Sequence, residues 1–329
     1  MRRIARRRRG VTTAALLAVA MTGSLVAACS SGGGAPHDGR GEPRSPHPQG
    51  SARTSTAPAA GPVLAVKIDN VPEARPQTGL DQADIVYAEQ VEGGLSRLMA
   101  VFATKLPKVV GPVRSARESD LELLRQFDDP TLAFSGAQHK LLPLIDKAPL
   151  NPEPPDKNSA AYFRGGDKAA PHNLYLRPQR LMKSAPGTAA LTTGFRFGAA
   201  PAGGTPQTTR TVHFPAARFT FTWSAERHRW LVAMDGTPTV TTDGARVAPA
   251  TVVVQYVQVR ASRFHDVLGN NSPYSQTVGS GKAQVLRDGR VFDVSWRRAS
   301  APDGTRFTTA DGTPMNFAQG QVWVVLAKA

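Results

Sequence analysis

Two glutamates in the first half of the chain have a spacing that could support catalysis. Glu89 and Glu92 belong to the stretch YAEQVEGGLSR, residues 87–97. In extended chain they would stand about 10 Å apart, and a turn at Gly93 and Gly94 would bring them closer. Carboxylates about 5–9.5 Å apart can cleave a glycosidic bond, one as acid and the other as base or nucleophile. The spacing is therefore compatible with a catalytic pair, Glu89 and Glu92, that acts on a cell-wall glycan.

Three arginines close to these glutamates favour a different chemistry. Arg97 ends the same stretch, and Arg114 and Arg117 follow in GPVRSARESDLELLRQF, residues 111–127. Ser115 and Glu118 have the spacing of a capping box, so Ser115 is predicted to be the N-cap of a helix that begins at residue 116. A helix N-terminus disfavours cations, so the arginines need a negative partner.

That partner is either internal or external. If it is internal, Glu89 or Glu92 forms ion pairs with the arginines inside the fold. If it is external, Arg97, Arg114 and Arg117 form an anion-binding site together with free N–H groups of the helix. Both alternatives place the arginines beside the glutamates at the polar centre of the first half.

Two further candidates come from the loop sequence AAPHNLYL, residues 169–176. His172 could move a proton, or it could be a hydrogen-bonded loop anchor beside Pro171. We include His172 and Asn173 among the candidate ligand-binding residues. The histidines are scattered and Cys29 is the only cysteine, so no metal site is predicted. No cofactor is expected, because GSGK, residues 279–282, is too short for a phosphate loop and is interpreted as a glycine turn into a hairpin.

The elements before residue 30 predict export and lipid attachment. Six arginines lie within the first nine residues, and an apolar run follows them up to LVAAC, which ends at Cys29. This order is typical of a signal peptide, residues 1–29. Small residues directly before a lone cysteine resemble a lipobox, so Cys29 is predicted to carry diacylglycerol and a further acyl group such as palmitate. The export route, general secretory or twin-arginine, stays open.

Composition divides the rest of the chain. Residues 30–61 are rich in Gly, Pro and Ser and predict a disordered tether that spans about 30 Å. The formal net charge of the whole chain is +15. An exported basic domain suits anionic headgroups or wall polymers, whereas export and the absence of a dense Lys/Arg run after the signal argue against nucleic acid.

Hydrophobic periodicity predicts two modules. Residues 62–197 mix strands, at 63–69, 83–91, 98–104, 108–113 and 131–136, with short helices at 116–127, 137–146 and 178–183. This pattern predicts an α+β or α/β module with a mixed sheet. Residues 198–210 are interpreted as a linker. Residues 211–329 show alternation and an Asp288-Gly289 turn, and predict a smaller, mainly antiparallel β module.

Several motifs resemble one known family. ARPQTGLDQADIVYAEQVEGGLSRLMAVF, GPVRSAR and PHNLY are similar to the N-terminal module of the YerB-like bacterial lipoproteins, and GSGKAQVLRDGR and DGTPMNFAQGQVWVVL to its C-terminal module. The resemblance covers nearly all of residues 62–329. It implies a two-module fold and a lipid-anchored location, but no reaction.

These observations together predict a lipid-anchored protein on the extracytoplasmic face of the cell membrane. Its expected role is binding or scaffolding in the envelope, with a wall polymer, an anionic headgroup or an envelope enzyme as partner. The alternative is the glycan-acting enzyme that uses Glu89 and Glu92. Whether the protein is an enzyme is left open by its sequence.

Overall fold

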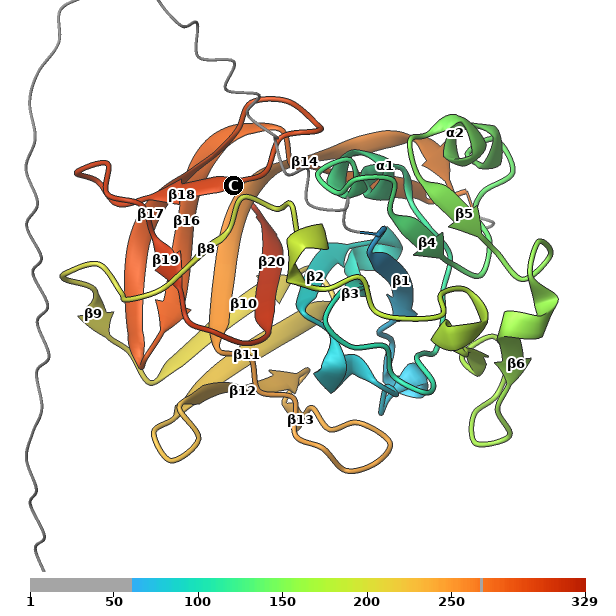
Figure 1. The fold of residues 1–329 in the computed structure, drawn as a ribbon, viewed down its shortest axis with the longest axis horizontal. Coiled ribbons are helices and arrows are strands. Elements are labelled where there is room, and N and C mark those ends of the chain that lie inside the picture. The colour runs from blue at the N-terminus through green and yellow to red at the C-terminus, as the bar shows by residue number, and fades with distance from the viewer. Residues whose placement is uncertain (1–60, 267–268) are drawn as a thin grey trace, which may run out of the picture. The chain divides into compact units, whose positions relative to one another are not determined.

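A large mixed sheet forms the centre of the computed structural model, which describes residues 61–266 and 269–329 (Figure 1). The sheet has twelve strands. In spatial order its main path is β18 (Arg306–Thr308), β17 (Arg290–Arg298), β16 (Gly279–Arg287), β14 (Thr251–His265), β20 (Val322–Lys328), β2 (Ile85–Gln90), β3 (Ser96–Phe102), β1 (Leu64–Asp69), β4 (Thr131–Ala133) and β5 (Asn151–Glu153). Off this path, β15 (Asn271–Gln276) pairs with β14, and β9 (Thr205–Pro206) pairs with β17.

The two halves of the chain share this sheet. Strand β20, from the C-terminal end, lies parallel to β14 on one side and parallel to β2 on the other. Strands β1, β2 and β3 of the first half are antiparallel neighbours, while β1 and β4 are parallel. The described residues accordingly belong to one compact unit. Strand pairing runs without interruption from one half of the chain to the other. The module boundaries at 197 and 211 therefore stay predictions.

A smaller antiparallel sheet covers part of one face of the large sheet. Its strands are β10 (Thr209–Phe214), β11 (Ala217–Ser224), β12 (Arg229–Met234) and β13 (Thr237–Pro238). The rings of Phe219 and Phe221 on β11 pack against Trp323 on β20, with centroids 6.2 and 6.0 Å apart. Aromatic burial of this kind stabilises sheet packing strongly. Two short pairs complete the strands, β8 (Arg196–Phe197) with β19 (Asn316–Phe317) and β6 (Tyr162–Arg164) with β7 (Leu174–Leu176).

Two short α-helices lie over the opposite face of the sheet (Figure 1). The α-helices are α1 (Glu118–Leu124) and α2 (Leu142–Lys147), and the 3-10 turns are η1 (Pro72–Ala74), η2 (Leu80–Gln82), η3 (Glu92–Gly94), η4 (Ser159–Ala161), η5 (Pro178–Arg180) and η6 (Thr188–Ala190). The described part of the chain is therefore mostly sheet. A mixed sheet was predicted for the first module and is present as part of the larger sheet, but an α/β layer there is less clear than expected, since its helices span only one to two turns.

Three predicted elements differ from the structure. Residues 108–113 make only isolated bridges rather than a strand, because Pro112 has no N–H to donate to a ladder. The helix predicted at 178–183 is the 3-10 turn η5. Gly279–Lys282, interpreted as a turn, instead begins strand β16. The hairpin predicted at Asp288-Gly289 is confirmed: both residues have positive φ, 50° and 70°, between β16 and β17.

Side-chain alternation places a row of charges on the helix-covered face. Apolar residues such as Ala65 and Met99 occupy this face and pack with Leu123 and Leu124 of α1. Because strand side chains alternate, Lys67 on β1, Glu89 on β2 and Arg97 on β3 continue the same face. The row lies at the ends of β1 and β2 and the start of β3, next to the start of α1, and it forms the candidate site.

Candidate functional site

The innermost part of the site is a fully buried lysine between two carboxylates. Lys67 is completely buried; it contacts Glu89 and lies 2.8 Å from Asp120 Oδ1 on α1. The second oxygen of Glu89 accepts a hydrogen bond from Ser119 Oγ at 2.8 Å. Burial lowers the pKa of Lys67 to about 8, although Asp120 opposes this shift. These contacts attach α1 to strands β1 and β2.

Helix α1 begins two residues later than predicted. The backbone of residues 114–116 is held extended, because Arg114 N donates to Lys67 O and Ala116 N donates to Gly136 O. Arg117 is the N-cap residue, and its N–H donates to Asp120 Oδ2 at 2.7 Å. The capping box expected from Ser115 and Glu118 is therefore wrong; the acidic partner is Asp120.

Arg117 and Glu92 form a two-pronged ion pair at the helix start. Arg117 Nε and Nη2 lie 2.6 and 2.7 Å from the two oxygens of Glu92, which also accepts from Ser272 Oγ of β15. Burial alone would raise the pKa of Glu92, but the bonds from Arg117 and Ser272 lower it to about 2. Glu92 is thus ionised at neutral pH. Its negative charge offsets the unfavourable interaction between Arg117 and the positive end of the helix dipole.

A fourth carboxylate, Asp69, binds the outer cations. Its Oδ2 lies 3.2 Å from Arg114 Nε and 2.8 Å from His172 Nδ1. Asp69 is buried, whereas Arg114 and His172 are 24% and 21% exposed. Arg114 therefore pairs with Asp69 rather than with Glu89 or Glu92. The loop histidine is anchored to the same carboxylate, with its ring reaching solvent.

Arg97 lies at the middle of the cluster and pairs with no carboxylate among the described residues. In the sheet register it faces Asp69 on one side and Glu89 on the other, but these two residues pair with other cations. Its side-chain contact is a hydrogen bond of 3.1 Å from Nη1 to Ser115 O. The side chain is only 9% exposed. The pKa of Arg97 is lowered to about 9, mainly by burial. The charges of Arg117 and Arg114 also lower this pKa, whereas Glu92 and Asp69 raise it.

Asn173 does not belong to this cluster. Its Oδ1 accepts from Arg164 Nη1 at 2.7 Å, and its Nδ2 donates to Gly165 O at 3.0 Å. Both bonds stay within the loop, so the contacts of Asn173 are those of a loop anchor. The predicted lipid attachment site, Cys29, lies outside the described residues.

The other half of the chain holds α1 from its far side. Glu118 accepts from Ser262 Oγ at 2.5 Å, and Glu122 accepts from the backbone N–H groups of Thr277 and Val278 at 2.6 and 3.0 Å. Arg298, fully buried, donates to the carbonyl of Glu122 at 2.8 Å and so caps the C-terminal end of the helix. The charged cluster is therefore framed by both halves of the chain.

Sequence reasoning missed four members of the cluster: Lys67, Asp69, Asp120 and Ser272. A lysine inside the apolar strand LAVKID was a usable signal, because a charge on a buried strand face needs a partner. Asp120 lies three residues after the observed N-cap and would have been found with the helix start placed correctly. Ser272 comes from a distant hairpin, and nothing local in its sequence indicates this contact.

The arrangement suits anion binding better than acid–base catalysis. In its outer part three arginines face two carboxylates, Asp69 and Glu92, with His172 beside them. The guanidinium of Arg97 has planar donors for a carboxylate or a phosphate. Glu89 and Glu92 are each bound by a cation, so neither is placed as a free acid. Within residues 61–266 and 269–329 there is no group of three or more His, Cys, Asp or Glu residues that could hold a metal ion.

Comparisons with known proteins connect this chain to bacterial lipoproteins. Residues 50–191 match the family described as "Protein of unknown function (DUF3048) N-terminal domain", and residues 210–324 match the C-terminal domain of the same family. The chain is 25% identical over 282 residues to "Putative lipoprotein YerB" of Bacillus subtilis (strain 168), covering 79% of this chain and 80% of the relative. The crystal structure of the YerB protein from Bacillus subtilis has a similar fold. Its TM-score is 0.67 at 21% identity, over 82% of this chain and 91% of that one.

One further observation bears on membrane attachment. None of the helices in the described ranges is long and apolar enough to span a bilayer.

Proposed function

Because the chain belongs to the two-module YerB-like lipoprotein family, we propose that it is lipid-anchored outside the cytoplasmic membrane and binds an anionic group of the cell envelope. Arg97, Arg114 and His172 contact that anion. The observation that carries the proposal is the unpaired guanidinium of Arg97, nine-tenths buried between two other arginines. A buried charge without a partner is costly, and a bound anion removes that cost.

The chemistry of the site defines the ligand class. The anion is a phosphate or a carboxylate that accepts from the Arg97 fork, with Arg114 and His172 at the open side of the cluster. Lipid headgroups and wall polymers both carry such groups. The glycan-acting alternative stays a prediction that the ion pairs of Glu89 and Glu92 do not favour.

Substitution of Arg97 tests the site directly. The Tm of the whole chain carrying Cys29→Ser is measured with and without inorganic phosphate, pyrophosphate or glucuronate at constant ionic strength. At about 100 times the dissociation constant, binding stabilises the fold by about 2.7 kcal/mol, which raises Tm by about 5–10 °C. Arg97→Met is expected to be as stable as the parent or more so without anion, since it removes an uncompensated charge, and to show no shift.

The matched control is Arg227→Met, an exposed arginine elsewhere on the surface, which is expected to keep the full shift. A shift with phosphate indicates a phosphate ligand, and a shift with glucuronate indicates a carboxylate ligand. An equal shift in the Arg97→Met variant, or no shift in the parent with any of the three anions, contradicts the proposed site.

Lipid attachment at Cys29 has its own test. The lone cysteine after an export signal and the similarity to a named lipoprotein support it. In cells fed a fatty-acid analogue, the parent chain is expected to become labelled, whereas Cys29→Ser stays unlabelled and remains unprocessed or is released from the membrane. A mature parent protein that carries no label would overturn the assignment.

A further inference from the structure

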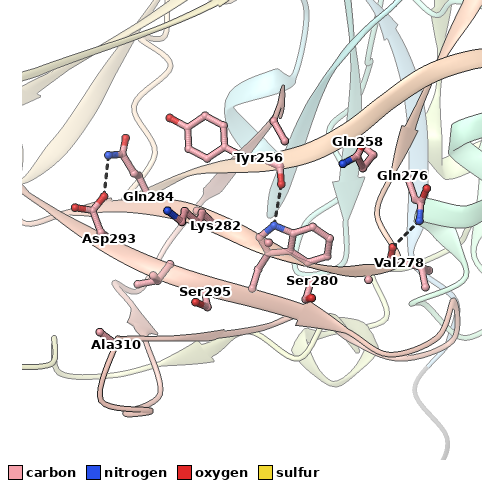
Figure 2. A pocket seen from close by; sticks show the side chains of 16 residues that line it. Tyr256, Gln258, Gln276, Val278, Ser280, Lys282, Gln284, Asp293, Ser295 and Ala310 are labelled. Carbon is pink, nitrogen blue, oxygen red and sulfur yellow. Dashed lines mark hydrogen bonds between the residues drawn. The ribbon is translucent and has the colours of Figure 1, made fainter.

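A cavity with a different chemical character lies in the C-terminal half, away from the charged cluster. It measures about 860 Å³ and lies where β14 diverges from the paired strands β16 and β17, beyond Gln255 and Ala283 (Figure 2). Cavities that bind small molecules usually have volumes of 300–1,000 Å³. The small sheet packs over Leu286 and Val291 on the same face of β16 and β17. Beyond these residues that face is uncovered, and the cavity occupies it.

The lining combines hydroxyl and amide groups with aromatic rings. Figure 2 shows Tyr256 and Gln258 across the pocket from Ser280 and Ser295. In the register Lys282 on β16 faces Ser295 on β17, which puts both on the open face. The side chains of Gln258, Ser280, Lys282 and Ser295 have no hydrogen-bond partner among the described residues. They are free to bond a ligand.

Glycine at the start of β16 lets an aromatic ring lie close against the strand beside this cavity. A Cβ on Gly281 would come within 2.7 Å of Trp296 Nε1, whereas a Cβ on Gly279 would meet nothing within 4 Å. The indole can therefore lie across Gly281, where it donates to Tyr256 O at 2.9 Å. The GSGK motif, residues 279–282, thus forms part of the cavity wall, a role that its sequence did not indicate.

The walls are fixed before any ligand arrives. Val278 N–H is bound by Glu122 of α1 at 3.0 Å, and Tyr256 OH accepts from Arg210 Nη2 at 2.9 Å. Gln276 Nε2 donates to Val278 O at 3.2 Å. A site whose lining is held by its surroundings loses little entropy on binding.

We infer that this cavity is a binding site for a neutral oligosaccharide. Sugar hydroxyls both donate and accept hydrogen bonds, and they match the serine and glutamine side chains of the lining. The apolar faces of sugar rings match the partly exposed side chains of Tyr256 and Val278. Lys282 and Asp293 are the charged side chains of the lining, and their formal charges cancel. The lining side chains therefore carry no net formal charge, in contrast to the cluster around Arg97.

Calorimetric titration of the whole chain carrying Cys29→Ser tests this site with two probes, cellotetraose and tetra-N-acetylchitotetraose. Ser295→Phe places a ring in the cavity from an exposed strand position and is expected to weaken binding at least about tenfold. Thr222→Phe is the matched control: it puts the same ring on an exposed position of β11 and is expected to leave the affinity unchanged. Thermal melts of both variants confirm that they fold.

Salt separates a neutral ligand from an anionic one. Binding is expected to change less than about threefold between about 50 and 500 mM NaCl. Saturable binding with this pattern supports the inference. It is overturned if neither probe binds up to about 10 mM, if Ser295→Phe binds as well as the parent, or if binding falls steeply with salt. Each of these outcomes is independent of anion binding at Arg97.

Discussion

Replacing Lys67 by Met is expected to destabilise the protein by about 3–5 kcal/mol, or to prevent folding. Lys67 is fully buried and is the cation that contacts both Glu89 and Asp120. Methionine fills similar volume but carries no charge, so two carboxylates would be left inside the protein without their lysine. Urea unfolding of purified variants, followed by circular dichroism, measures the loss.

Two variants give this prediction its controls. Lys282→Met removes an exposed lysine from strand β16 and is expected to change stability by no more than about 0.5 kcal/mol. Adding Glu89→Gln to Lys67→Met removes one of the stranded charges and is expected to recover part of the loss. A cost for Lys67→Met no larger than that for Lys282→Met would show that the buried triad does not hold α1 to the sheet.

Replacing Arg117 by Met is expected to destabilise the protein by about 2–4 kcal/mol at pH 7. The loss of one partner from a buried pair costs about 3–5 kcal/mol, and partial exposure of Arg117 and Glu92, 12% and 8%, reduces that cost. Arg97→Met, at a neighbouring position in the same cluster, is expected to stabilise the protein or to leave its stability unchanged. The contrast separates the arginine that serves the fold from the arginine that serves a ligand.

The Arg117 effect is also expected to depend on pH. The folded pKa of Glu92, about 2, lies below its ordinary value of 4.5. The ion pair therefore contributes its full stability above about pH 4.5, and the contribution is lost as the pH falls through 2. Urea unfolding at pH 7 and near pH 2 should show a gap between parent and Arg117→Met that closes in acid. A gap that is equal at both pH values would contradict the proposed role of the pair.

Local sequence patterns predicted the elements but not the way they combine. Apolar alternation located β1, β2 and β3, and Asp288-Gly289 located the β16–β17 hairpin, because these depend on neighbouring residues. The pairing of β20 with β2 joins residues more than two hundred positions apart. No local pattern specifies such a partner, so the shared sheet could not be predicted.

The charged cluster was predicted in part for the same reason. Arg97, Arg117 and Glu92 were identified as a group because they lie near each other in the sequence and need partners of opposite charge. Asp69 and Lys67 precede them by a strand, and Ser272 arrives from a hairpin of the other half. The start of α1 was misplaced because tertiary hydrogen bonds to Lys67 O and Gly136 O hold residues 114–116 extended, against the local capping preference.

A crystal structure of the protein soaked with tungstate, a heavy tetrahedral analogue of phosphate, tests the anion site most directly. We expect an anomalous density peak within hydrogen-bond distance of Arg97, with Arg114 or His172 as a second contact, and the ion pairs of Glu92 and Asp69 unchanged. The same soak of Arg97→Met is expected to leave that position empty. If the parent shows Arg97 bonded to a carboxylate of the protein, with tungstate bound elsewhere or not at all, the cluster is a closed ion-pair network and the account is wrong.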